Sequence, residues 1–198
     1  WMIGKSSVAI TDALEADKVA GGGVFVHFDN ISGKKAEVYV DTEVHNSGKR
    51  TRTVAVETVL ADAGDVPVKR VSQQVKLQAG ESKTVRQRFA VRNPKLWSPD
   101  SPYLYRIQSR VKAGHEVLDG GVTRVGIRKA EFKGKDGFWL NGKPFGQLVG
   151  ANRHQDFAYV GNALPNSQQW RDAKRLRDAG CTIIRVACLL YTSDAADE

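Results

Sequence analysis

The chain has 198 residues, of which 41% are hydrophobic and 26% are charged, as is usual for a globular protein. No apolar run approaches the roughly 20 residues that a membrane-spanning helix needs. The net charge of +8 comes from 30 basic and 22 acidic side chains. These charges are interleaved and no zinc-finger or RNA-binding motif accompanies them, so we disfavour nucleic-acid binding. The two cysteines, Cys181 and Cys188, do not have the spacing of a metal site or a disulfide framework, and we expect no cofactor.

About seven short segments between residues 24 and 125 have the composition of β-strands. From Ala36 to Val44 apolar and polar residues alternate, which predicts a strand with one dry and one wet face. Turn sequences such as Asn46-Ser47-Gly48-Lys49 separate the segments at intervals of about ten residues. The other strands are expected at 24–28, 51–61, 71–77, 85–91, 105–111 and 116–125. This series favours an all-β immunoglobulin-like sandwich over residues 21–126, without the cysteine pair of antibody domains.

The sequence changes character after Gly126. Residues 138–145 predict a tight hairpin around Asn141-Gly142, because this pair suits a type I′ turn, in which both central residues have positive φ.

Beyond the hairpin, one strand–helix–strand unit is expected. A short buried strand is predicted at 148–151, followed by a helix from an N-cap at Ser167 to a terminal glycine at Gly180. Residues 182–186 are apolar and β-branched, as in a strand of a parallel sheet. One such βαβ unit cannot bury its own faces, so we expect only the beginning of a larger parallel sheet or barrel.

Four segments carry a family resemblance. They are Asn93-Pro94-Lys95-Leu96-Trp97-Ser98-Pro99-Asp100-Ser101-Pro102-Tyr103-Leu104-Tyr105, Gly126-Ile127-Arg128-Lys129, Phe138-Trp139-Leu140-Asn141-Gly142-Lys143-Pro144 and Gly150-Ala151-Asn152-Arg153-His154. In this order they resemble family 2 of the glycoside hydrolases, the β-galactosidase, β-glucuronidase and β-mannosidase group. The resemblance implies a retaining, β-galactosidase-like exo-glycosidase that acts on a β-linked sugar or oligosaccharide. It also implies that residues 1–20 are the remnant of a preceding domain and that a truncated (β/α)₈ TIM barrel begins over residues 127–187.

The resemblance also implies a set of substrate-binding residues. Asn152, Arg153 and His154 would lie at the end of the first barrel strand, where barrel enzymes place their active sites. Asn152 and His154 are expected to contact sugar hydroxyls, with Arg153 partly structural and Asp156 a further hydroxyl contact. Arg185 would lie near the nucleophilic carboxylate and favour its ionised form. Without the resemblance, the residues favour a polar loop with ordinary caps, and Arg185 would pair with any neighbouring acid.

The family pattern ends at Ala187, where His-Tyr-Pro is expected and Cys188-Leu189-Leu190 stands instead. We therefore expect residues 188–198 to be non-native sequence, with a cleavage or splice variant as the alternative. No Glu occurs between Glu131 and Glu198, and the chain has no Asn-Glu pair. Both catalytic glutamates of the family are thus missing, and we expect this chain to be inactive by itself.

The sequence alone also allows other interpretations of the function. A non-catalytic immunoglobulin-like module for carbohydrate binding or adhesion would need only the sandwich. Residues 1–10 lack the pattern of a signal peptide, and a periplasmic or secreted parent protein remains compatible with the sequence. The sugar, its linkage and the oligomeric state stay open as well.

Overall fold

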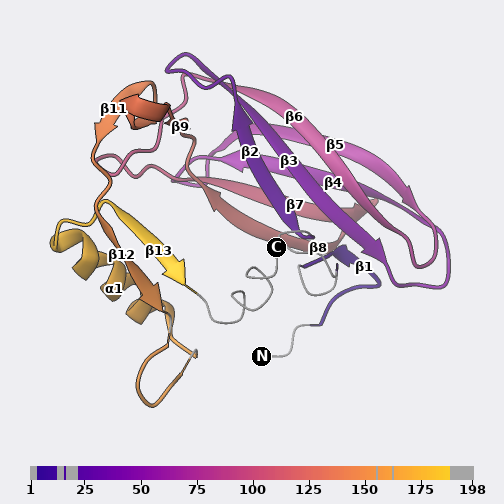
Figure 1. Cartoon of the computed structure of the whole chain (residues 1–198). Helices are drawn as coiled ribbons and strands as arrows, with labels where there is room; N and C mark the ends of the chain where they lie inside the picture. The colour runs from indigo at the N-terminus through magenta and orange to yellow at the C-terminus, as the bar shows by residue number, and fades with distance from the viewer. Residues whose placement is uncertain (1–3, 13–15, 17–21, 155, 162, 188–198) are drawn as a thin grey trace. The chain divides into compact units, whose positions relative to one another are not determined.

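The computed structural model describes residues 4–12, 16, 22–154, 156–161 and 163–187 (Figure 1). The expected non-native segment 188–198 lies outside the described residues. The described residues divide into two compact units, one within residues 4–130 with 140–142 and one within residues 131–139 with 143–187. No helix in the described part of the chain is long and apolar enough to cross a membrane.

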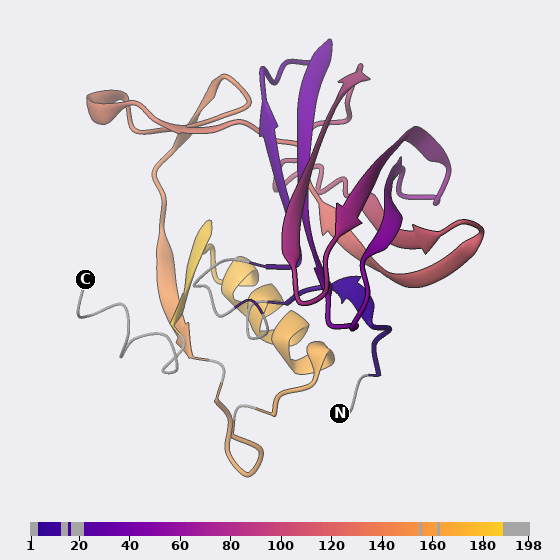
Figure 2. The ribbon, with the colours of Figure 1, turned by 90° about the vertical axis from the view of Figure 1, so that its right-hand side faces the viewer.

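The first unit is a sandwich of two antiparallel sheets, which Figure 2 shows as separate layers. In one sheet β3 (Lys35–Asn46) pairs on one side with β6 (Ser82–Arg92), and on the other with β1 (Val8–Ile10) and β2 (Val24–Asp29). The second sheet has the following strand order: β5 (Pro67–Leu77), β4 (Arg52–Ala61), β7 (Tyr105–Ala113) and β8 (Glu116–Val125). The expected β-sandwich is therefore confirmed.

All the strands expected between residues 24 and 125 are present, because alternating apolar side chains fill the space between the sheets. In β6, for example, every second residue from Val85 to Val91 is buried and the residues between them are exposed. The strand β1 was not expected. It pairs with the end of β3, and Val8 is only 1% exposed. Three residues are too few for an alternating pattern to be recognised in the sequence.

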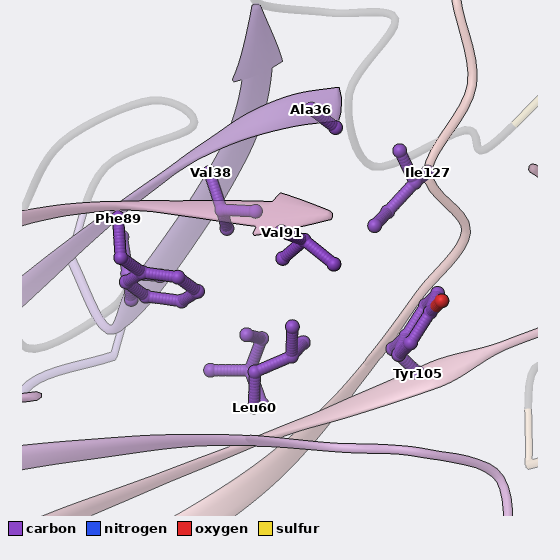
Figure 3. Close-up of a cluster of buried hydrophobic side chains, with 9 residues drawn as sticks. Ala36, Val38, Leu60, Phe89, Val91, Tyr105 and Ile127 are labelled. Atoms are coloured by element: carbon purple, nitrogen blue, oxygen red, sulfur yellow. The ribbon is translucent and has the colours of Figure 1, made fainter. Parts of the chain in front are cut away.

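The core of the sandwich consists of two clusters of buried side chains. The first joins Val38 of β3, Phe89 of β6 and Leu60 of β4, with Ile127 from the segment after β8 (Figure 3). The second cluster lies around Val44, Val56, Leu77 and Val111. Both sheets contribute to each cluster, so the hydrophobic effect holds the two layers together without a disulfide.

The predicted hairpin is formed by β10 (Phe138–Leu140) and β11 (Lys143–Gly146), with β9 (Ala130–Phe132) beside β10. A short 3₁₀ turn, Gly134–Asp136, precedes it. Asn141 and Gly142 have φ of 52° and 78°, so the positive φ values expected of a type I′ turn are confirmed.

The second unit contains two parallel strands, β12 (Gly150–His154) and β13 (Ile183–Ala187), joined through α1 (Asn166–Asp178). The predicted N-cap at Ser167 is wrong. The N-cap residue is Pro165, whose backbone is extended. Its carbonyl oxygen accepts hydrogen bonds from the backbone nitrogens of Gln168 and Gln169.

The helix end is as predicted. Gly180 has φ of 89°, and its backbone nitrogen donates to the carbonyl oxygen of Arg177 at 2.9 Å. The nitrogen of Cys181 donates to the carbonyl oxygen of Leu176 at 2.9 Å. These two bonds form a Schellman motif, in which glycine tolerates the left-handed backbone.

The first strand of this unit lies further along the chain than the predicted segment 148–151. Its position follows from pairing with β13, in which Gly150 lies opposite Ile183 and His154 lies opposite Ala187. A Cβ atom on Gly150 would lie 2.1 Å from the carbonyl oxygen of Ile183, so the close approach of the strands requires glycine here.

Candidate functional site

The two parallel strands bring Asn152 and Arg185 together. These residues are direct partners in the register of β12 and β13. Partners across a sheet project from the same face, and side chains two positions apart in one strand share that face. Asn152, His154 and Arg185 are all exposed, and together they form what we call the open face of the strand pair.

Arg153 projects from the opposite face, towards α1. Its Nη2 lies 2.9 Å from Oδ2 of Asp172, and the side chains of Arg153 and Asp172 are 11% and 26% exposed. Gln168 donates from Nε2 to Oδ1 of the same carboxylate at 3.1 Å. The helix therefore fixes β12 through this ion pair, and the open face is the side of the strands away from it.

Sequence reasoning missed the contact between Arg153 and Asp172. Asp172 falls within the predicted helix, and no motif marks it as a partner of Arg153. The alternation of side chains along β12 was the available signal, because it puts Arg153 opposite Asn152 and His154 once the strand is extended to His154.

Asp156 follows β12 in a loop and is exposed. The loop closes on itself through a bridge between Phe157 and Gly161. Of the five residues expected to bind substrate, Asp156 is the one that the strand pair does not position. Asn152, His154 and Arg185 are brought together on one face, and Arg153 is held on the other.

The open face can donate hydrogen bonds and present positive charge. Asn152 and Arg185 carry N–H donors, and His154 can donate or accept. Neither β12 nor β13 contains an acidic residue, so the strand pair by itself offers no carboxylate to act as acid, base or nucleophile. In the part of the chain that the structure describes, no group of three His, Cys, Asp or Glu side chains could hold a metal ion.

Comparison with known proteins addresses the sandwich and the strand pair together. The family model of glycosyl hydrolases family 2 matches residues 23–128. A β-galactosidase of Thermoanaerobacter pseudethanolicus is 32% identical over 165 residues, which are 83% of this chain and 21% of that enzyme. A β-glucuronidase of Formosa agariphila is 29% identical over 171 residues, or 85% of this chain and 17% of that enzyme.

Solved structures give the same result. A glycosyl hydrolase family 2 member from Bacteroides cellulosilyticus superposes with a TM-score of 0.81 at 30% identity, covering 92% of this chain and 24% of that one. A β-glucuronidase of Bacteroides uniformis has a TM-score of 0.75 at 28% identity, covering 83% and 20%. The chain thus spans about a fifth of the length of the relatives it matches. Because the family model covers more than half of its residues, the chain belongs to glycosyl hydrolase family 2.

Proposed function

We propose that this chain is part of a retaining, β-galactosidase-like exo-glycosidase, to which it supplies the central sandwich and the first sugar-contacting strands. The observation that carries the proposal is the pairing of Asn152 with Arg185 on the open face. A second observation supports it: the family model of glycosyl hydrolases family 2 matches residues 23–128, which form the sandwich. Relatives named β-galactosidase and β-glucuronidase both match the chain, so the match does not choose between the two sugars. The choice of a β-galactoside as substrate is part of the proposal.

The strand pair and α1 are the beginning of a (β/α)₈ barrel, with the immunoglobulin-like sandwich at 21–126 and the barrel portion at 127–187. Apolar side chains support this proposal. Val186 on β13 is 66% exposed and Trp170 on α1 is 68% exposed. Parallel strands are normally covered on both faces, so further strands and helices of a barrel would remove these side chains from water.

In such a barrel the open face becomes part of the interior at the active-site end. Asn152 and His154 then hydrogen-bond the hydroxyls of the bound sugar. Arg185 provides positive charge beside the nucleophilic carboxylate and so favours its ionised form. Arg153 supports binding from behind the strand, through its ion pair with Asp172.

Hydrolysis with retention needs two carboxyl groups about 5–5.5 Å apart, one as acid and base and one as nucleophile. The chain has no Glu between Glu131 and Glu198, and the open face carries no carboxylate. The chain as it stands is therefore a non-catalytic part of the enzyme.

Two experiments test this proposal. The purified chain is assayed with nitrophenyl β-galactoside, β-glucuronide and β-mannoside, and no turnover above a mock preparation is expected. The source gene is then read beyond codon 187, where we expect the barrel to continue with two glutamates. In the protein so encoded, Asn152→Ala and Arg185→Ala should lower kcat/KM.

Turnover by the chain itself would contradict the proposal, and so would a continuation without the two glutamates. The second outcome would favour the non-catalytic binding module, because such a module needs no barrel. A matched control for the barrel substitutions is Arg92→Ala at the exposed end of β6, which should leave kcat/KM unchanged.

A further inference from the structure

The two outer faces of the sandwich differ in charge. On the outer face of the β3 sheet, acids and bases are paired. Arg86 contacts Asp41 at 2.6 Å, and Arg88 contacts Glu37 at 2.6 Å. Lys35 contacts the second oxygen of Glu37 at 2.7 Å. This face is close to electrically balanced.

The outer face of the β4 sheet is not balanced. Residues that are partners across β5, β4 and β7 form rows on this face. One row is Arg70, Val59 and Gln108, and the next is Ser72, Glu57 and Arg110. We call this surface the basic face. Its basic residues are Arg70, Lys76, Arg106, Arg110, Lys112 and Arg124, and its strand residues include one acid, Glu57.

Glu57 lies at the centre of the basic face and is 6% exposed. Its carboxylate is 3.2 Å from Arg70, 3.7 Å from Arg110 and 3.8 Å from Lys112. One negative charge is thus shared by three cations, and an excess of positive charge remains around it.

The rest of the basic face adds to this excess. Arg124 lies opposite Arg106, and Lys76 lies opposite Thr53, so neither has an acidic neighbour across the strands. Arg106 has an acidic contact of its own, Asp65 in the loop between β4 and β5, at 3.2 Å. Lys76 and Arg124 are both exposed.

We propose that the basic face binds an extended polyanionic glycan that carries carboxylate or sulfate groups. Arginine predominates, and its planar fork of N–H donors matches these groups. Adjacent strands lie about 4.8 Å apart, so the cations form a flat array that an extended chain can cross. The choice of a glycan rests on the proposed glycosidase function.

Two other partners fit this surface less well. The side chains of the strand rows of the basic face include no aromatic ring, on which the bases of single-stranded nucleic acids stack. The cores of protein–protein interfaces are depleted of lysine and glutamate, whereas Lys112 and Glu57 lie at the middle of this face.

The test measures binding of the purified chain to polygalacturonate and chondroitin sulfate, with dextran as the neutral control glycan and a short DNA duplex as the competing polyanion. The test variant combines Lys76→Gln, Arg110→Gln and Arg124→Gln, which leaves Arg70 and Lys112 with Glu57. The control variant removes the same charge elsewhere, through Lys34→Gln, Arg50→Gln and Arg92→Gln at exposed positions. Thermal unfolding verifies that both variants are folded.

We expect salt-sensitive binding to at least one anionic glycan, none to dextran, and about tenfold weaker binding by the test variant, as three exposed ion pairs contribute together. Arg110→Lys keeps the charge but not the planar fork, so it should retain only part of the affinity. Equal binding by the test and control variants would refute the proposal, and so would tighter binding to the duplex than to the glycans. Because this experiment needs no turnover, its failure is distinct from failure of the proposed glycosidase function.

Discussion

Asn141 and Trp97 are joined by a hydrogen bond across 44 positions of the sequence. Nδ2 of Asn141 donates to the carbonyl oxygen of Trp97 at 3.0 Å, and its Oδ1 accepts from the backbone nitrogen of Lys129 at 3.0 Å. The backbone nitrogen of Trp97 donates to the carbonyl oxygen of Ile127 at 2.8 Å. One amide side chain therefore links three of the family motifs: the loop after β6, the segment after β8 and the turn of the hairpin.

This link predicts the effect of Asn141→Asp. The substitution keeps the size of the side chain and the acceptor for Lys129, but it replaces the donor to Trp97 with a carboxylate oxygen. We expect a loss of about 1–3 kcal/mol in the free energy of unfolding, since the carbonyl of Trp97 then lacks this partner. Urea unfolding followed by tryptophan fluorescence measures it. Asn93→Asp is the control, because Asn93 also has positive φ, at 46°. Equal losses in the two variants would show that the Trp97 bond is unimportant.

A second prediction concerns the ring of Trp97. A Cβ atom on Gly126 would lie 2.8 Å from Cγ of Trp97, which is too close for carbon atoms to approach. Gly126→Ala should therefore displace the indole and destabilise the sandwich by about 1–3 kcal/mol, as overpacking does. Gly121→Ala in β8 is the matched control, because its added Cβ meets nothing within 4 Å. Comparable melting temperatures for the two variants would contradict this prediction.

The sequence could predict the parts of the fold that local chemistry determines. Alternation located the strand from Lys35 to Asn46, and the Asn141-Gly142 pair located the type I′ turn. It could not locate β12 correctly, because the bounds of that strand depend on pairing with Ile183–Ala187 more than 30 positions later. The short strand Val8–Ile10 depends in the same way on pairing with the far end of β3.

The candidate site divides similarly. The motif identified Asn152 and His154 as neighbours, and alternation alone puts them on one face of a strand. That Arg185 lies directly beside Asn152 depends on the register of the two parallel strands. Alternation along β12 also puts Arg153 on the other face, but its pairing with Asp172 depends on how α1 packs against the strands across 19 positions of sequence.

A third prediction concerns acid stability. The pKa of Glu37 is lowered from 4.5 to about 2, first by the hydrogen bond from Lys35 and then by those from Arg88 and Asn30. Since the folded pKa lies below the unfolded one, Glu37 stabilises the fold fully above about pH 4.5. This contribution is lost as the pH falls towards 2.

The variant Glu37→Gln isolates this effect, because it has no carboxyl group to titrate at this position. The difference in unfolding free energy between the wild-type chain and Glu37→Gln should be largest near pH 7 and should shrink between about pH 4.5 and pH 2. Urea unfolding at a series of pH values measures it. Parallel curves for the two proteins over this range would contradict the assignment.

The last prediction concerns the ion pair behind the open face. Asp172→Asn removes the negative charge beside Arg153, whose side chain is 11% exposed. We expect the free energy of unfolding to fall by about 1–3 kcal/mol, because a largely buried guanidinium then lacks its charged partner. The control is Asp178→Asn on the same helix. Asp178 pairs with Lys174, and the side chain of Asp178 is 59% exposed. Removing this exposed pair should lower the free energy of unfolding by only about 0.3–0.5 kcal/mol.

Hydrogen exchange read by mass spectrometry locates this effect. Asp172→Asn should speed exchange in β12 and β13, where the ion pair fixes the strand, and should leave the sandwich strands unchanged. A double-mutant cycle with Arg153→Met separates the pair from the rest of the helix contact, since the two substitutions should cost less together than the sum of their separate costs. If Asp172→Asn and Asp178→Asn change exchange in β12 equally, Arg153 is not held by Asp172, and the orientation of Asn152 and His154 does not depend on the helix.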